Sequence, residues 1–235
     1  MQEKIYNLTL ETLEHENYFR DVLVEDRTNN YYWSDAWDAE LYIKLAQLGF
    51  ISTSYETKEG LVMLPELQVE YSILDFKNLH ISQKVKKLLN KNSYELSFNT
   101  HFETIIEEIA KQHKHNWFKD EYVELMQELY SKNWDNFKLV SVALLTRETN
   151  SLVAGEIGYI IGKTYTSLTG FSSREKVHNN CGTLQLVVLA HYLEKNDFSF
   201  WSLGHPHMEY KKKLGAKTYS REEFLQRWQE SVRCV

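Results

Sequence analysis

The stretch LVAGEIGYIIGKTYTSLTG (152–170) contains two runs of β-branched, aromatic and small residues on either side of Gly162-Lys163. Val, Ile, Tyr and Thr are enriched in strands, and a two-residue connection that contains glycine is typical of a β-hairpin. The pattern therefore predicts strands at Leu152–Ile161 and Lys163–Gly170, joined by a tight turn. A similar run at Phe137–Thr146 predicts the strand that precedes them.

A helix and a last strand are expected after this hairpin. Residues 182–194, GTLQLVVLAHYLE, are apolar nearly all round a helix, so this helix should be buried against a sheet. Phe198–Leu203 predicts a short, fully apolar strand. The element order indicates an α/β (α+β) layer fold rather than a bundle or a sandwich. It resembles the order found in GNAT-like acyltransferase folds.

The segments before the hairpin are amphipathic. We expect a helix at Ile81–Leu89, a strand at Ser93–Phe98 and a helix around residues 122–130. Two capping boxes, Thr100–Glu103 and Ser220–Glu223, predict the starts of two more helices.

The first part of the chain is less regular. Asp35–Gly49 predicts a helix that ends at glycine. Thr53–Gly60 is a polar stretch between this helical pattern and an extended one, and Leu61–Phe76 predicts two edge-like strands. The pattern becomes regular from His80 onward. We therefore expect a small N-terminal subdomain at residues 1–78 and a GNAT-like transferase domain at residues 79–235.

Composition excludes several classes of protein. The 235 residues are 43% hydrophobic and 26% charged, which is enough for a packed core. The formal net charge of −6 argues against a general nucleic-acid or DNA binder, which needs a broad basic face. No apolar run is long enough for a membrane helix, and the acidic start is not a signal peptide. We therefore expect no membrane association and a cytoplasmic location.

Cysteine and histidine usage points to no metal site. Cys181 and Cys234 form no CxxC pair and are expected to be reduced thiols. His113, His115 and His178 have no cysteine or carboxylate at ligand spacing. We expect neither a metal nor a cofactor.

Six fragments carry a resemblance to a known family. They are AELYIKLAQLGFISTSY (39–55), LHISQKVKKLL (79–89), YELSFNTHFETIIEEIA (94–110), NWFKDEYVELMQELY (116–130), LVAGEIGYIIGKTYTSLTGFSSR (152–174) and FSFWSLGHPHMEYKKKLGA (198–216). None is specific alone, but all six occur in the family's order. Over residues 35–230 the chain resembles the leucyl/phenylalanyl-tRNA–protein transferases.

The resemblance implies a tRNA-dependent aminoacyltransferase. Such an enzyme moves a hydrophobic, Leu- or Phe-like amino acid from its tRNA to the N-terminal amine of an acceptor protein, which marks that protein as an N-degron for degradation. The implied partners are the acceptor end of aminoacyl-tRNA and the N-terminus of a protein.

The sequence departs from the family where the family carries its acids. The hairpin carboxylate of the family aligns with Thr169, and its D-x-Q motif falls within Ser202–His205. Glu156, in the hairpin, is the best replacement acid, with an exposed strand position as the alternative. His205 is a candidate for orienting or deprotonating the amine, unless it is a surface loop residue. Ser202 and Thr169 could hydrogen-bond the amine or the carbonyl, or be satisfied locally.

Loss of these acids does not end the enzyme hypothesis. An α-amino group has a reference pKa of about 7.7–8 and attacks an already activated ester. A general base is worth about 10²–10⁴ in rate, and positioning and oxyanion stabilisation can supply the rest.

The binding candidates are less specific. Trp117 aligns with a family Trp that the resemblance places near the terminal adenosine of the tRNA, although a core Trp is equally consistent. Lys84, Lys86 and Lys87 could contact acceptor-stem phosphates, or form a solvated helix face; the trio Lys211–Lys213 has the same two interpretations. The family's apolar donor pocket maps to four residues that any such fold would bury, Ile157, Leu186, Leu189 and Trp201.

Two alternatives to transfer from tRNA stay open. A GNAT-like acyltransferase with another donor is disfavoured because no Q/R-x-x-G-x-G/A loop for CoA precedes the buried helix. A non-catalytic binder of aminoacyl-tRNA ends or protein N-termini is favoured by the missing carboxylates. Asn179, Asn180 and Gly182 could present backbone N–H groups to an anion, although simple helix capping explains them equally well.

Overall fold

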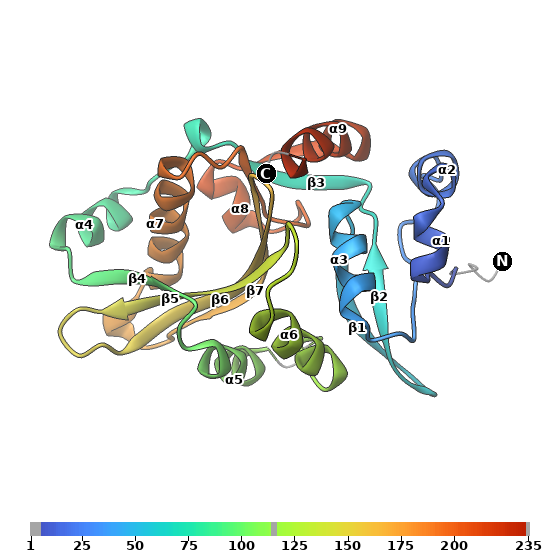
Figure 1. The fold of residues 1–235 in the computed structure, drawn as a ribbon. Helices are drawn as coiled ribbons and strands as arrows, with labels where there is room; N and C mark the ends of the chain where they lie inside the picture. The colour runs from blue at the N-terminus through green and yellow to red at the C-terminus, as the bar shows by residue number, and fades with distance from the viewer. Residues whose placement is uncertain (1–5, 114–116, 234–235) are drawn as a thin grey trace.

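A computed structural model describes residues 6–113 and 117–233 of the chain (Figure 1). Its helices are α1 (Leu10–Glu14), α2 (Glu16–Tyr18), α3 (Ala39–Gln47), α4 (Gln83–Lys91), α5 (Phe102–Gln112), α6 (Glu121–Ser131), α7 (Cys181–Lys195), α8 (Glu209–Leu214) and α9 (Arg221–Val232). Its strands are β1 (Ile51–Thr57), β2 (Gly60–Glu66), β3 (Glu70–Leu74), β4 (Tyr94–Phe98), β5 (Lys138–Thr146), β6 (Leu152–Ile161), β7 (Thr164–Ser172), β8 (Phe200–Ser202) and β9 (Lys217–Ser220). Short π-helical and 3-10 turns lie at Phe19–Val24, Phe76–Asn78 and Lys176–His178.

A seven-stranded sheet forms the centre of the molecule. Its strand order is β4-β5-β6-β7-β8-β3-β9. All neighbouring pairs are antiparallel except β7 and β8, which are parallel. The predicted hairpin is confirmed: β6 and β7 pair from Ala154↔Ser172 to Ile161↔Thr164 around the Gly162-Lys163 turn. The parallel pair needs a crossover, and α7 supplies it.

Helices cover both faces of this sheet (Figure 1). α5 and α6 pack on one face through Ile105, Ile109, Leu125 and Met126, all of them buried. α7 packs on the other face in a separate cluster that includes Leu184, Val187 and Leu189. The apolar character of α7 follows from this position, because the helix contacts the sheet along most of its length.

The N-terminal part shares the core of the sheet. β1 and β2 form a two-stranded antiparallel sheet with the register Ser54↔Met63. Leu45, Phe50 and Met63 are buried in the same apolar cluster as Ile105 and Ile109 of α5. β3, at residues 70–74, lies inside the seven-stranded sheet. A division of the chain at residue 78 stays a proposal.

Three local predictions need correction. The polar stretch Thr53–Gly60 is mostly strand β1, because its pairing with β2 overrides its composition. α5 begins at Phe102 after a left-handed His101 (φ 59°), and no capping box forms there. Thr100 instead donates its hydroxyl to Ser97 Oγ over 2.9 Å. β3, expected as an edge-like strand, is an inner strand that pairs with β8 and β9. Neither α8 nor β9 was predicted from the sequence.

The second capping box is confirmed. Ser220 Oγ accepts a hydrogen bond from the backbone N–H of Glu223, and Glu223 Oε2 accepts one from the N–H of Ser220 over 2.8 Å. Cys181 is a free, buried thiol, whereas Cys234 and His115 lie outside the described residues. Within the part of the chain that the structure describes, none of the helices combines the length and apolar character that a bilayer crossing requires.

Candidate active site

A pocket of about 980 Å³ lies where β7 and β8 separate. The two strands pair only through Thr164–Thr166 and Phe200–Ser202. Beyond that pairing β7 continues to Ser172, while the chain after β8 turns away at Gly204, whose φ of +70° favours glycine. Ligands of open α/β sheets bind beyond the carboxyl ends of parallel strands for this geometric reason. The residues that line the pocket come from β6, β7, the segment between β7 and α7, the first turns of α7, the loop after β8, α8, the end of α5 and Trp117.

Glu156 of β6 is the buried carboxyl of this pocket. It is only 5% exposed and lines the cavity. Its Oε1 accepts a hydrogen bond from the Tyr165 hydroxyl over 2.6 Å and another from Ser167 Oγ over 2.9 Å. Ser167 Oγ in turn accepts a hydrogen bond from Trp201 Nε1 over 2.9 Å. The second oxygen, Oε2, has no hydrogen-bond partner among the described residues.

This environment makes Glu156 an unusually weak carboxylic acid. Burial, which penalises the charged form, raises the pKa of Glu156 to about 7, although the hydrogen bonds from Tyr165 and Ser167 act in the opposite direction. The carboxyl is therefore close to half-ionised at neutral pH. Such a group can both take and return a proton, which is the requirement for general acid–base catalysis.

The other predicted catalytic residues lie at different depths. Thr169 is half-buried and lines the pocket, opposite Ile157 of β6. Ser202 is 1% exposed inside the sheet, between β3 and β7, and does not line the pocket. His205 also lies outside the lining. Its Nε2 is 2.8 Å from Oε2 of the buried Glu66. The structure therefore brings together Glu156 and Thr169, and not Ser202 or His205.

Glu66 explains the position of His205. The Glu66 carboxylate also accepts hydrogen bonds from Asn30 Nδ2 over 2.9 Å and from Gln68 Nε2 over 3.3 Å. This polar cluster joins the N-terminal segment to the loop after β8. It is separate from the pocket that contains Glu156.

The predicted tRNA contacts fall in two places. Trp117 lines the pocket and packs edge-to-face on Tyr122 with ring centroids 5.1 Å apart. Lys84, Lys86 and Lys87 are exposed on α4, which packs against α7 but does not line the pocket.

The predicted apolar donor pocket is only partly assembled. Leu186 of α7 lines the cavity, whereas Ile157, Leu189 and Trp201 have no exposed surface. Trp201 still reaches the site indirectly, through its hydrogen bond to Ser167. Apolar contact in the pocket comes instead from Leu168, Phe171, Leu203 and Met208.

Lys211 is a site residue that the sequence did not reveal. The run Lys211–Lys213 suggested an exposed face, but Lys211 is 4% exposed and lines the pocket. Its Nζ donates to the carbonyl oxygens of Leu203 and His205, and burial lowers the pKa of Lys211 to about 8. It holds the loop after β8 against α8. Only tertiary packing distinguishes it from its two neighbours.

Gln185 is the second unexpected residue. It is 3% exposed on α7 and lines the pocket. A lone amide in an otherwise apolar helix was the sequence signal that could have identified it. Across residues 6–113 and 117–233, no three His, Cys, Asp or Glu side chains are arranged to hold a metal ion.

Comparison with solved structures identifies the class of fold. The FemX crystal structure superimposes with a TM-score of 0.51 at 10% identity, covering 92% of this chain and 78% of that one. Together with the splayed parallel pair, this confirms the predicted α/β, GNAT-like fold.

Sequence comparison then gives the family. The family model described as leucyl/phenylalanyl-tRNA protein transferase matches residues 73–229, which is more than half of the chain. This chain belongs to that family, as its sequence fragments predicted.

Named relatives are distant. The leucyl/phenylalanyl-tRNA–protein transferase of Maridesulfovibrio salexigens is 27% identical over 164 residues, covering 68% of this chain and 64% of that protein. The one of Flavobacterium johnsoniae is 26% identical over 159 residues, covering 65% of this chain and 69% of the relative. The match to the first thus spans less than two thirds of its length.

Proposed function

We propose that this protein transfers an amino acid from aminoacyl-tRNA to the N-terminal amine of an acceptor protein. The observation that carries the proposal is Glu156, a buried and nearly half-ionised carboxyl in the pocket between β7 and β8 of a chain whose family is named for this transfer. The donor amino acid would be hydrophobic and Leu- or Phe-like. The tag would act as an N-degron in the cytoplasm, where charged tRNA is available.

The chemistry assigned to Glu156 is a proton shuttle. The lone pair of the acceptor amine attacks the ester carbonyl carbon, which forms the new C–N bond, and the Glu156 carboxylate takes a proton from the nitrogen. When the C–O bond to the ribose breaks, the carboxylic acid returns that proton to the ribose oxygen. The unpartnered Oε2 is the oxygen for this role, since Oε1 is held by Tyr165 and Ser167.

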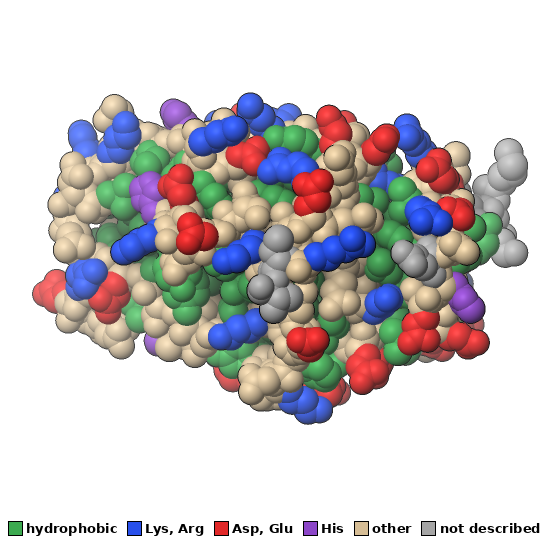
Figure 2. All heavy atoms as spheres, turned by 45° about the horizontal axis from the view of Figure 1, so that its top comes forward, with side chains coloured by type: hydrophobic (Ala, Val, Ile, Leu, Met, Phe, Trp, Pro, Cys, Tyr) green, Lys and Arg blue, Asp and Glu red, His purple; other side chains and the backbone are tan. Residues whose placement is uncertain are grey.

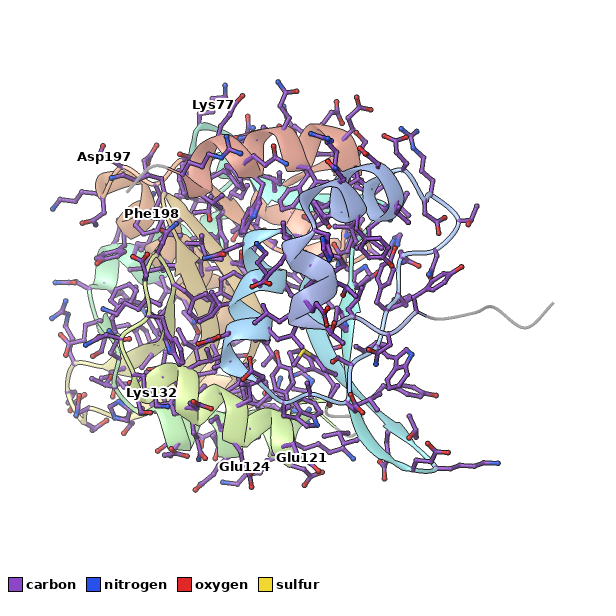
Figure 3. The ribbon with its side chains drawn as sticks, turned by 45° about the vertical axis from the view of Figure 1, so that its right-hand side comes forward. Lys77, Glu121, Glu124, Lys132, Asp197 and Phe198 are labelled. Carbon is purple, nitrogen blue, oxygen red and sulfur yellow. The ribbon has the colours of Figure 1, made fainter. Side chains whose placement is uncertain are left out.

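The charge distribution supports one direction of tRNA approach. Glu121 and Glu124 of α6 point away from the sheet into solvent (Figure 3), and Glu103 and Glu107 of α5 are exposed as well. These acidic helices would repel a phosphate backbone. The exposed lysines of α4, beside α7, are the more favourable surface for the acceptor stem. Trp117, in the pocket, would stack on the terminal base, a contact worth about 1–3 kcal/mol.

Transfer can be tested directly. The protein is incubated with a pool of tRNAs charged with radiolabelled amino acids and with peptides that begin with Arg, Lys, Asp or Glu. Glu156→Gln and His205→Ala are measured alongside. We expect labelled peptide with the wild type and His205→Ala, and a large loss with Glu156→Gln. No transfer to any peptide, with every charged tRNA supplied, would contradict the proposal.

A non-catalytic binder is the second candidate. It is favoured by the residues at the family's acid positions, because Thr169 carries no carboxylate and Ser202 is buried outside the pocket. This candidate predicts that charged tRNA binds as well to Glu156→Gln as to the wild type and that neither protein forms product. A donor other than tRNA would show instead as thermal stabilisation by CoA thioesters.

A further inference from the structure

The first turn of α7 presents three unpaired N–H groups to the pocket. Asn180 precedes the helix in a left-handed conformation (φ 71°), and its side chain does not cap the helix. The first satisfied donor is the N–H of Leu184, which bonds to the carbonyl of Asn180 over 2.9 Å. The N–H groups of Cys181, Gly182 and Thr183 have no acceptor within the described ranges, and all three residues line the pocket. Simple capping by Asn180 is therefore not the explanation of this sequence.

The amide of Gln185 is an independent sign of a ligand at the same place. Only 3% of the surface of Gln185 is exposed, yet its side chain makes no hydrogen bond to any residue that the structure describes. A helical side chain leans toward the N-terminus of its helix. Gln185 therefore extends over Cys181 and Gly182, along the pocket wall. Because Gln185 lines the pocket and its amide has no partner among the described residues, the amide is available to hydrogen-bond a polar ligand there.

The surrounding charge favours an anion. The N-terminus of the fifteen-residue helix α7 carries the positive end of the helix dipole. Arg174, Lys176 and His178 line the pocket on the segment between β7 and α7. The opposing carboxylate in this segment, Glu175, is 75% exposed and lies 3.9 Å from His178 Nε2.

We propose that the N-terminus of α7 and the Gln185 amide bind a phosphodiester group of the tRNA 3′ end. The inference rests on the proposed function and adds a second anchor to it. The phosphate would lie on the three free N–H groups while the aminoacyl ester lies at Glu156, in the same pocket. A volume of about 980 Å³ is near the upper limit of small-molecule sites, which suits a nucleotide together with its aminoacyl group.

The test compares two uncharged ligands by calorimetry at low salt. Cytidylyl-(3′→5′)-adenosine carries one phosphodiester, and adenosine carries none. We expect the dinucleotide to bind about tenfold or more tightly than adenosine, the scale of hydrogen bonds to a charged group. The variant Thr183→Glu places a carboxylate beside the free N–H groups, and it should abolish most of this preference.

Two further variants separate charge from folding. Thr183→Gln has nearly the same shape as Thr183→Glu without its charge, and it should keep the preference for the dinucleotide. Thr183→Glu should fold at least as stably as the wild type, because an acid in the first turn complements the helix dipole. Gln185→Leu should reduce the preference in part.

The outcomes distinguish this site from the transfer activity. A dinucleotide that binds no better than adenosine, or a preference that Thr183→Glu leaves intact, overturns the phosphate site even if transfer occurs. A preference that only Thr183→Glu and Gln185→Leu reduce supports the site even if no transfer is found, because neither ligand carries an amino acid.

Discussion

At the scale of the residue, the role that we propose for Glu156 predicts how activity should depend on pH. Its pKa of about 7 means that the carboxylate needed to accept a proton increases as the pH rises through neutrality. We expect kcat/KM to rise with pH and to reach half of its maximum near pH 7, the pKa of Glu156. Glu156→Gln should lower kcat/KM by about 10²–10⁴ and leave only the ionisation of the acceptor amine, near pH 8. A rise near pH 7 that persists in Glu156→Gln would exclude this role.

The same residue predicts a dependence of stability on pH. The carboxyl titrates near 4.5 when exposed and near 7 in the folded protein, so folding disfavours its ionised form. The contribution of Glu156 to stability should fall as the pH rises from about 4.5 to 7 and fall no further above 7. Glu156→Gln should therefore gain about 3 kcal/mol relative to the wild type at pH 8 and almost nothing at pH 4.

Urea unfolding at both pH values measures this difference. The control is Glu148→Gln, at an exposed position on the turn between β5 and β6, which should change stability equally at both pH values. Equal effects of Glu156→Gln at pH 4 and pH 8 would show that Glu156 titrates normally.

At the scale of the element, α9 is fixed by its first residue. Arg221 is 6% exposed, and its guanidinium donates to carbonyl oxygens on two separate segments. The acceptors are Leu23, Val24 and Asp26 in the N-terminal segment and Leu67 and Gln68 between β2 and β3. One side chain thus joins the N-terminal segment, the β2–β3 connection and α9.

Replacement of Arg221 should destabilise the whole fold. Arg221→Met leaves the buried carbonyls without their donor, so we expect a loss of about 3–5 kcal/mol. Arg221→Lys should recover only part of this loss, because an ammonium group cannot reproduce the planar fork of donors. Arg27→Met, at an exposed arginine, should change stability by less than about 0.5 kcal/mol. Thermal unfolding of the three variants tests the assignment, and Arg221→Met behaving like Arg27→Met would contradict it.

At the scale of the whole molecule, charge limits how the protein could hold the tRNA that we propose as its donor. The net charge is −6, and Figure 2 shows basic side chains interleaved with acidic ones over the visible face rather than gathered in one broad patch. The cations that we assign to the tRNA are Lys84, Lys86 and Lys87 of α4 and Arg174 and Lys176 at the pocket. Such a surface suits a few phosphate contacts near one end of the RNA.

The salt dependence of binding measures the number of those contacts. Five contacts give a slope of log K against log salt of about −4.5 at the steepest. Changing the three α4 lysines to alanine should reduce the slope by about 3. The three exposed acidic residues Glu103, Glu107 and Glu121 serve as the control set, since their replacement by alanine should leave the slope nearly unchanged. A slope much steeper than −5 would indicate a larger RNA-binding surface.

Much of the fold could be predicted because it depends on local patterns. The β6–β7 hairpin, the buried helix α7, the capping box at Ser220 and the apolar faces of α5 and α6 all follow from residue spacing. β1 and the start of α5 could not be predicted in this way. Their residues are polar or carry a misleading cap, and pairing with β2 and with the end of β4 determines their conformation.

The family and the fold class could be predicted from the sequence because they depend on residue order, and Glu156 stood out as a candidate acid because it is a carboxylate in an apolar hairpin. Only the tertiary structure decided which candidates share a pocket: it includes Thr169, Trp117 and Leu186 and places Ser202, His205 and Trp201 outside. It also revealed Lys211 and Gln185. The physical reason is that burial and hydrogen-bond partners arise where distant segments meet, here at the divergence of β7 and β8, and a linear pattern does not record that meeting.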